Sequence, residues 1–247
     1  MEMAIESYVN QLSSSSPTPG GGGTSALFGA LGSALGSMVA ALTAGKKKYA
    51  EYEQDIQKIL AETARLNQRF LELMEADEKA FAPLSRAYGV SKDDPARDSL
   101  LEEALKGAAE PPIQVLQTCS SLIEVLEELA IKGSRLAISD AACGAAACEA
   151  AAKAASMNIF INTKLLKDRS YAQELNLTAV TEVENISSRC EALQAQIRAE
   201  LLTSRMNDPA QNPSLDENTD FSPIRQLRGM PVVKSMCAAL APRLEAL

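Results

Sequence analysis

The sequence predicts an all-α fold of long, closely packed helices. Apolar residues make up 46% of the 247 residues, aromatic residues only 4%, and tryptophan is absent. The core must therefore be built mainly from alanine, leucine, isoleucine and valine, a composition that favours packed helices over a sandwich of strands. Apolar residues also recur at intervals of three and four with charged residues between them, which is the helical period.

The predicted helices follow from this period and from the breakers between the periodic segments. We expect helices within residues 1–13, 26–44, 49–82, 95–109, 113–131, 139–162 and 164–204, the last as one helix or two. Pro83 is expected to end the third segment, because proline lacks the backbone N–H that a helix interior needs. Pro111 and Pro112 either begin a new helix or kink a longer one.

Charge and composition exclude several classes of function. The formal net charge of −8 argues against a nucleic-acid partner, because duplex binding needs a concentrated basic face. The absence of histidine removes the usual neutral-pH acid/base, the Ser/His and Cys/His nucleophile pairs, and most zinc sites. Proton transfer must then fall to Asp, Glu, Lys, Tyr or Cys, and no metal is expected.

The five cysteines indicate a reducing compartment. They are odd in number and include no Cys-x-x-Cys pair, so they are expected to be reduced, partly buried thiols. The acidic N-terminus shows no signal peptide, and we therefore expect a cytoplasmic protein.

A run of four glycines, Gly20, Gly21, Gly22 and Gly23, precedes the uncharged segment 26–44. Thr24 and Ser25 follow the run and are both good N-cap residues. Glycines let backbone N–H groups approach a ligand closely, and a helix N-terminus carries partial positive charge. The run is therefore typical of a loop that receives an anionic or polar ligand.

The glycine run does not fit two common nucleotide-binding motifs. A dinucleotide-binding fingerprint requires a preceding buried strand, which the serines and prolines of residues 13–19 cannot form. A Walker A loop requires a Gly-Lys-Ser/Thr triplet, and none follows. A flexible hinge before a helix remains the alternative.

The uncharged segment 26–44 is long enough to raise the question of a membrane span. Gly29, Gly32 and Gly36, with two serines, dilute its apolar content and place small residues three and four positions apart. Such spacing allows another backbone to approach closely. We therefore expect a central packing helix and no membrane partner.

Several polar residues have both a structural and a functional interpretation. Lys46 and its neighbours can favour a helix C-terminus or receive an anionic ligand, and Asp77 can belong to a solvated helix face. Ser139 or Asp140 can serve as an N-cap. Asn158 and Asn162, four residues apart, share one helix face and bond either neighbouring backbone or a polar ligand.

Several of these residues occur together in an ordered set of motifs. They are Pro19-Gly-Gly-Gly, a small-residue helix with Met38-Val39, Thr43-x-Gly45-Lys46-Lys47-x-Tyr49, Asp77-x-x-Ala80-Phe81, Ser139-Asp140, and Asn158-Ile-Phe-Ile-Asn162. In this order the set resembles the formiminotransferase-cyclodeaminase C-terminal domain family, which includes stand-alone methenyltetrahydrofolate cyclohydrolases. The resemblance implies an up-and-down all-α bundle, a homodimer, and a reduced folate bound near the glycine loop and the dimer interface.

The resemblance covers roughly the first 205 residues. We therefore expect one helical domain at 1–205, followed by a loop and C-terminal tail at 206–247 to which no role is assigned. Two departures from the family pattern are Ala155-Ser156, where Gly-Ala is usual, and four loop glycines, where three are common. Neither departure removes a group able to carry chemistry.

The resemblance also implies the roles of individual residues. Asp140, Lys46 and Asp77 are the expected catalytic groups, with Asp140 holding the substrate cation and activating water. The expected substrate-binding residues are Gly20, Gly21, Gly22, Gly23, Lys47, Tyr49, Ser139, Asn158 and Asn162. No cofactor or metal is expected beside the folate substrate.

Three functions stay open from the sequence. The first is hydrolysis of methenyltetrahydrofolate, favoured because no formiminotransferase domain precedes the resembling region. The second is cyclodeamination of formimidoyltetrahydrofolate with release of ammonia. The third is a non-catalytic helical bundle whose small-residue faces serve assembly.

Overall fold

A computed structural model describes residues 5–203 of the chain, and those residues form helices joined by short connections. The elements are α1 (Ile5–Leu12), α2 (Gly21–Ala41), η1 (Lys47–Tyr52), α3 (Glu53–Gly89), α4 (Arg97–Lys132), η2 (Arg135–Ala137), α5 (Ile138–Thr163) and α6 (Arg169–Thr203). No strand occurs within residues 5–203. The prediction of an all-α fold is confirmed.

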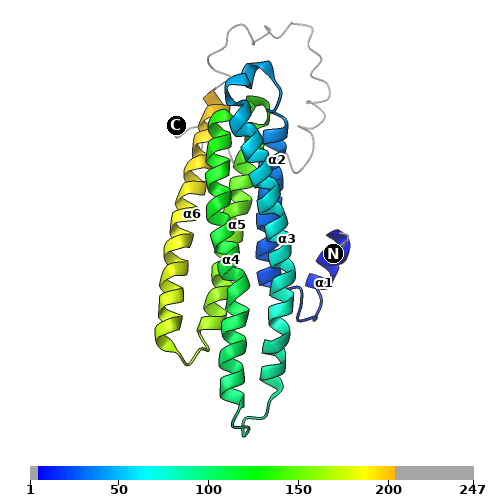
Figure 1. The fold of residues 1–247 in the computed structure, drawn as a ribbon, viewed down its shortest axis with the longest axis vertical. Helices are drawn as coiled ribbons and strands as arrows, with labels where there is room; N and C mark the ends of the chain where they lie inside the picture. The colour runs from blue at the N-terminus through cyan, green and yellow to red at the C-terminus, as the bar shows by residue number, and fades with distance from the viewer. Residues whose placement is uncertain (1–4, 204–247) are drawn as a thin grey trace, which may run out of the picture. The chain divides into compact units, whose positions relative to one another are not determined.

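Helices α2 to α5 lie side by side and alternate in direction (Figure 1). The direction is also visible in the contacts, because residues pair in opposite order along two antiparallel helices. The start of α2 meets Asp77 of α3, whereas Gly36 near the end of α2 lies beside Thr63 of α3. Likewise Gly21 lies beside Asn158 of α5, and Gly32 beside Gly144.

Small residues allow α2 to approach its neighbours closely. A Cβ atom added to Gly29 would lie 2.3 Å from the ring of Phe70, and one added to Gly32 would lie 3.0 Å from the carbonyl oxygen of Gly144. These positions face α3 and α5 respectively, so α2 is held between two helices by close backbone contact. The expectation of a central packing helix is confirmed.

Helix α2 is long and apolar enough to cross a membrane by length and composition alone, but half of its most apolar 18-residue window is buried within the fold. It also forms specific polar contacts with α3. The Ser33 hydroxyl donates to the Thr63 carbonyl oxygen at 2.7 Å, and the Asn67 side-chain amide donates to the Ala30 carbonyl oxygen at 2.9 Å. These are the contacts of a core helix.

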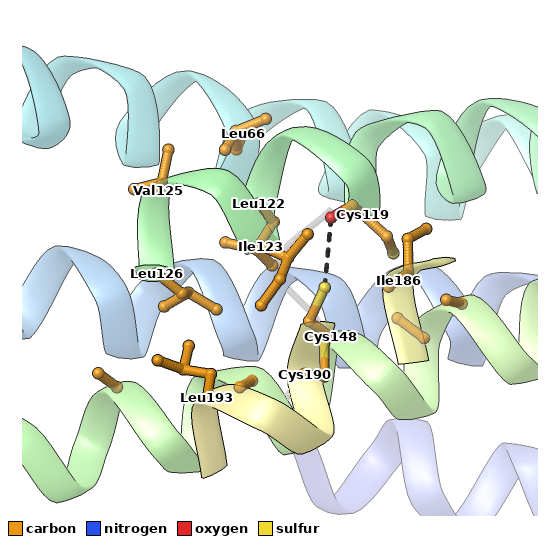
Figure 2. Close-up of a cluster of buried hydrophobic side chains, with 14 of the residues drawn as sticks. Leu66, Cys119, Leu122, Ile123, Val125, Leu126, Cys148, Ile186, Cys190 and Leu193 are labelled. Atoms are coloured by element: carbon orange, nitrogen blue, oxygen red, sulfur yellow. Dashed lines mark hydrogen bonds between the residues drawn. The ribbon is translucent and has the colours of Figure 1, made fainter. Parts of the chain in front are cut away.

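The main core joins side chains from α2, α3, α4, α5 and α6. Figure 2 shows part of it, where Leu66, Leu122, Leu126, Cys148 and Leu193 gather from four of these helices. The Cys148 thiol lies within 3.4 Å of the Cys119 carbonyl oxygen. The buried cysteines therefore serve as small core residues, as the sequence predicted.

The expectation that Pro83 ends a helix is wrong, since α3 continues through it to Gly89. The turns beyond Pro83 bury Leu84 and Ala87 in a second apolar cluster with α4, and this packing offsets the cost of a proline inside a helix. Pro111 and Pro112 likewise lie inside one continuous helix, α4. A proline in a helix interior costs about 3 kcal/mol, so tertiary contacts override local preference at these positions.

Within the described residues, one compact helical unit extends from residue 5 to Glu200. The loop and C-terminal tail expected at 206–247 lie outside the described residues. The domain boundary at residue 205 therefore stays a prediction.

The contact between Gly29 and Phe70 can be tested by adding a single methyl group. Gly29→Ala places a Cβ inside the Phe70 ring, and we expect it to lower the free energy of unfolding by about 1–3 kcal/mol. Gly107→Ala is the matched control on exposed α4, where nothing lies within 4 Å, and it should raise stability by about 1 kcal/mol. Urea denaturation measures both, and equal effects of the two changes would contradict close packing at Gly29.

Candidate active site

The glycine run forms the first turn of α2 instead of a loop ahead of it. Gly20 is the N-cap residue, and Gly21 already has helical backbone. The expectation that Thr24 and Ser25 cap the helix is wrong, because their hydroxyls donate back to the carbonyl oxygens of Gly20 and Gly22, at 2.7 and 2.6 Å. Serine and threonine form such bonds inside helices. The predicted helix N-terminus with glycine amides is present, but the helix begins at Gly21, about one turn before the predicted start.

The side chain of Asp77 rests on this first turn. Its Oδ2 accepts the backbone N–H of Gly23 at 2.8 Å. A Cβ atom added to Gly22 would lie 2.0 Å from Asp77 Oδ1, so any other residue there would displace the carboxylate. The carboxylate of α3 therefore lies at the positive end of α2, the place where the sequence predicted an anionic or polar ligand.

Burial raises the pKa of the Asp77 carboxyl, an effect opposed by the hydrogen bond from the Gly23 amide and reinforced by the nearby charge of Glu78. A carboxyl group with a raised pKa can exchange protons nearer neutral pH than an ordinary aspartate. The expectation that Asp77 faces a ligand site, in place of a solvated surface, agrees with this half-buried position.

The two carboxamides of α5 lie beside the same turn. Asn158 is in contact distance of Gly21, where an added Cβ would lie 3.2 Å from Asn158 Nδ2. Asn158 Nδ2 donates to the Ala154 carbonyl oxygen, and Asn162 Nδ2 donates to the carbonyl oxygens of Asn158 and Ala108. The asparagines therefore bond backbone, as one of the two interpretations predicted, and they also line a cavity, where a bond to a polar ligand stays a prediction.

That cavity, which we call the glycine pocket, has a volume of about 280 Å³. It is lined by Pro17, Thr18, Gly20, Gly21, Asp77, Phe81, Leu84, Tyr88, Ala108, Asn158, Ile161 and Asn162. Its lining combines an apolar wall with a carboxylate, two carboxamides and a helix N-terminus. Small-molecule sites commonly have this make-up.

Two aromatic residues of the glycine pocket, Phe81 and Tyr88, were not among the predicted site residues, although Phe81 belongs to the Asp77-x-x-Ala80-Phe81 motif. They lie four and eleven residues after Asp77 on α3. This spacing places all three side chains on one helix face. The helical spacing from Asp77 is therefore the sequence signal that could have identified both aromatic residues.

The remaining candidates lie at the other end of α2 and α5. Lys46 and Lys47 follow α2, whereas Ser139 and Asp140 stand in the first turn of α5. The hydroxyl of Tyr49 accepts the backbone N–H of Arg135 at 3.0 Å, and this bond lowers the pKa of Tyr49. The expectation that Ser139 or Asp140 is the N-cap is wrong, because Ala137 holds that position.

The two groups of candidates cannot meet on one small ligand within a single chain. Helix α2 has 21 residues and separates Gly20 from Lys46, which at 1.5 Å per residue corresponds to about 30 Å. The structure thus brings together Gly20, Gly21, Asp77, Asn158 and Asn162, and it places Lys46, Lys47, Tyr49, Ser139 and Asp140 apart from them. Within residues 5–203 no group of three metal-ligating side chains is present.

Comparison with known proteins agrees with this architecture. The family model described as "Formiminotransferase-cyclodeaminase" matches residues 4–181 of the chain. The chain belongs to the formiminotransferase-cyclodeaminase family. The match includes both groups of candidate residues.

Relatives in this family include a methenyltetrahydrofolate cyclohydrolase of Methylorubrum extorquens, 37% identical over 207 residues, with 82% of this chain and 97% of the relative covered. The formimidoyltransferase-cyclodeaminase of Sus scrofa is 28% identical over 202 residues, and the match covers only 37% of its length. Among solved structures, a formiminotetrahydrofolate cyclodeaminase from Thermotoga maritima matches with a TM-score of 0.70 and 28% identity, over 79% of this chain and 98% of that one.

The raised pKa of Asp77 has a consequence for stability. Because the folded chain holds the Asp77 proton more tightly than the unfolded chain does, stability falls as pH rises from the unfolded pKa, near 3.9, through the folded value. Asp77→Asn removes this charge and retains an oxygen to accept the Gly23 N–H. We expect the variant to be more stable than the wild type at pH 7, and the difference to vanish below about pH 4.

Chemical denaturation across this pH range measures the effect. Glu78→Gln is the comparison. It removes the neighbouring exposed charge that reinforces the raised pKa of Asp77, so it should raise stability at pH 7 by less than Asp77→Asn does. An Asp77→Asn variant that is less stable than the wild type at pH 7 would show that the ionised carboxylate stabilises the fold.

Proposed function

We propose that this chain is a methenyltetrahydrofolate cyclohydrolase, which hydrolyses 5,10-methenyltetrahydrofolate to 10-formyltetrahydrofolate, and that the glycine pocket is its active site. The observation that carries the proposal is the juxtaposition of Asp77 with the first turn of α2 and the carboxamide of Asn158. The similarity to the Methylorubrum extorquens cyclohydrolase over nearly the whole of that enzyme supports it.

The chemistry of the pocket suits this reaction. Methenyltetrahydrofolate holds one carbon between two nitrogens as a cationic amidinium. The carboxylate of Asp77 stabilises this cation and accepts a proton from the attacking water. Amides of the first turn of α2 then stabilise the oxygen of the tetrahedral adduct. The bond from the carbon to N5 breaks as N5 takes up the proton held by Asp77. The adduct hydroxyl loses its proton to solvent as the formyl carbonyl forms, so one proton is released overall.

The other walls of the pocket suit a flat heterocycle. Phe81 and Tyr88 offer aromatic surface to a ring. On the α5 side of the pocket, the carboxamide of Asn158 supplies a hydrogen-bond donor and an acceptor, and the oxygen of Asn162 supplies a second acceptor. A pterin ring carries both donors and acceptors along its edge and one apolar face, so these groups can orient it.

We also propose that the chain acts as a homodimer through α2. One face of α2 exposes apolar side chains and no charge, with Phe28 36%, Leu31 50%, Met38 41% and Leu42 45% exposed. In a twofold dimer, this face of α2 packs against the same face of the second chain, and the apolar side chains of both become buried. An antiparallel pairing brings the Lys46 and Asp140 end of one chain to the glycine pocket of the other, which gives these distant residues a role in a shared site.

Cyclodeamination of formimidoyltetrahydrofolate is the second candidate reaction. It is favoured by the structural match to the Thermotoga maritima cyclodeaminase. It uses the same ring system and needs the same acid/base groups, with ammonia as the leaving group. In either case we expect the enzyme to be cytoplasmic, in keeping with the free thiols of Cys119, Cys143, Cys148 and Cys190.

The near-ultraviolet absorption of methenyltetrahydrofolate provides the direct assay. We expect the chain to accelerate its loss, and Asp77→Asn to lower kcat/KM by about 100-fold or more, the usual contribution of a general base. Glu78→Gln should retain activity within about twofold. Acceleration that is unaffected by Asp77→Asn would contradict the proposed site. Formimidoyltetrahydrofolate with ammonia as the readout separates the two reactions.

A shared site can be tested by mixing two inactive variants, Asp77→Asn and Asp140→Asn. Random reassortment makes about half of the dimers mixed, and each mixed dimer has one site with both aspartates intact, so about a quarter of wild-type activity should return. No recovery after verified subunit exchange would show that the two aspartates do not act in one site across the interface.

A further inference from the structure

The side chain of Asn162 is held by two backbone carbonyl groups from two different helices. Its Nδ2 donates to the Asn158 carbonyl oxygen of α5 at 2.8 Å and to the Ala108 carbonyl oxygen of α4 at 3.2 Å. Carbonyl oxygens accept only, so the nitrogen of the carboxamide must face both of them. The oxygen of Asn162 is thereby left to face the glycine pocket, which Asn162 and Ala108 both line.

The Ala108 carbonyl is available for this bond because of a proline. In a regular helix the carbonyl of residue 108 accepts the N–H of residue 112. Residue 112 is a proline inside α4, so that N–H does not exist. The proline ring also clashes with the carbonyl four residues earlier and tilts it away from the helix axis. The freed carbonyl is then the one that Asn162 bonds.

The neighbouring proline provides an internal comparison. Pro111 is also buried inside α4 and frees the carbonyl of Gly107. Gly107 lines a different cavity, together with Arg86 and Glu103. The two prolines therefore carry the same cost to the helix, but only Pro112 is connected to the glycine pocket.

We propose that Pro112 is a positioning residue for the active site, because it releases the Ala108 carbonyl to fix the Asn162 carboxamide with its oxygen toward the substrate ring. This assignment rests on the proposed function of the glycine pocket. Pro112 itself touches no substrate and acts through Asn162 alone. Its value lies in supplying a second acceptor from α4, which ties the Asn162 amide to a neighbouring helix in addition to the Asn158 carbonyl of its own helix.

The test compares Pro112→Ala with Pro111→Ala. Restoring the N–H at position 112 gives Ala108 its helical partner and loosens Asn162. Asn162 contacts the substrate ring equally in the bound substrate and in the transition state. Loosening it should therefore raise KM by about tenfold and change kcat by less than about twofold. Pro111→Ala should leave KM unchanged. Equal KM values for the two variants would overturn the proposal.

A double-variant cycle separates positioning from a general effect on folding. In an Asn162→Ala background, Pro112→Ala should cause no further rise in KM, because the side chain it positions is gone. The same tenfold rise in that background would overturn the proposal. Thermal denaturation should show Pro112→Ala at least as stable as the wild type, since alanine is the better helix residue.

A readout without folate keeps this inference distinct from the proposed function. The side-chain amide signals of Asn162, assigned by their loss in Asn162→Ala, should shift in nuclear magnetic resonance spectra of Pro112→Ala and stay in place in Pro111→Ala. Unchanged signals in Pro112→Ala would overturn the positioning role. A wild-type chain that neither binds nor converts reduced folates would instead overturn the proposed function.

Discussion

The structure depends on how closely α2 approaches α3 and α5. Glycines at three- and four-residue intervals let α2 meet the Phe70 ring on one side and the Gly144 backbone on the other. The same close approach continues to the first turn of α2, where Gly22 leaves room for the Asp77 carboxylate and Gly21 lies against Asn158. The packing of the core and the construction of the pocket therefore follow from one constraint, the absence of side chains at the glycine positions of α2.

The bundle contains two features that are unfavourable in helical proteins, a half-buried carboxylate and prolines inside a helix. A half-buried carboxylate is placed on a glycine-rich turn, and two prolines interrupt the hydrogen bonds of α4. Each of these features costs stability, and cavities are lined by Asp77 and by Gly107 and Ala108, the residues whose carbonyls the prolines free. Functional residues often lower the stability of a protein, and the rest of the fold compensates for that loss. The rest of the bundle, with its continuous apolar core, supplies the compensating packing.

The sequence predicted the helical class because alanine-rich composition and helical periodicity agree along the chain. It also identified Asp77, Asn158 and the glycines, whose positions in ordered motifs carried their significance. The expected helix over 26–44 already implied that Lys46 lies about a helix length from Gly20. The sequence could not show that Asp140 lies at the Lys46 end, because spacing along a chain does not reveal how separate helices pair. Thr24 was an expected cap because of its residue type, whereas the helix begins at Gly21 and its first turn contacts Asp77 of α3, a tertiary contact that residue type does not reveal. Pro83 was expected to end a helix, but packing beyond it prevails.

The central claim is that a reduced folate binds in the glycine pocket. A crystal structure with 5-formyltetrahydrofolate, a stable relative of the product, tests it most directly. The account predicts the pterin ring against Phe81 and Tyr88, its edge at Asn158 and Asn162, and its one-carbon substituent beside Asp77 and the first turn of α2. A ligand bound only at the Lys46 and Asp140 end, with no part of it reaching any glycine pocket, would contradict the account.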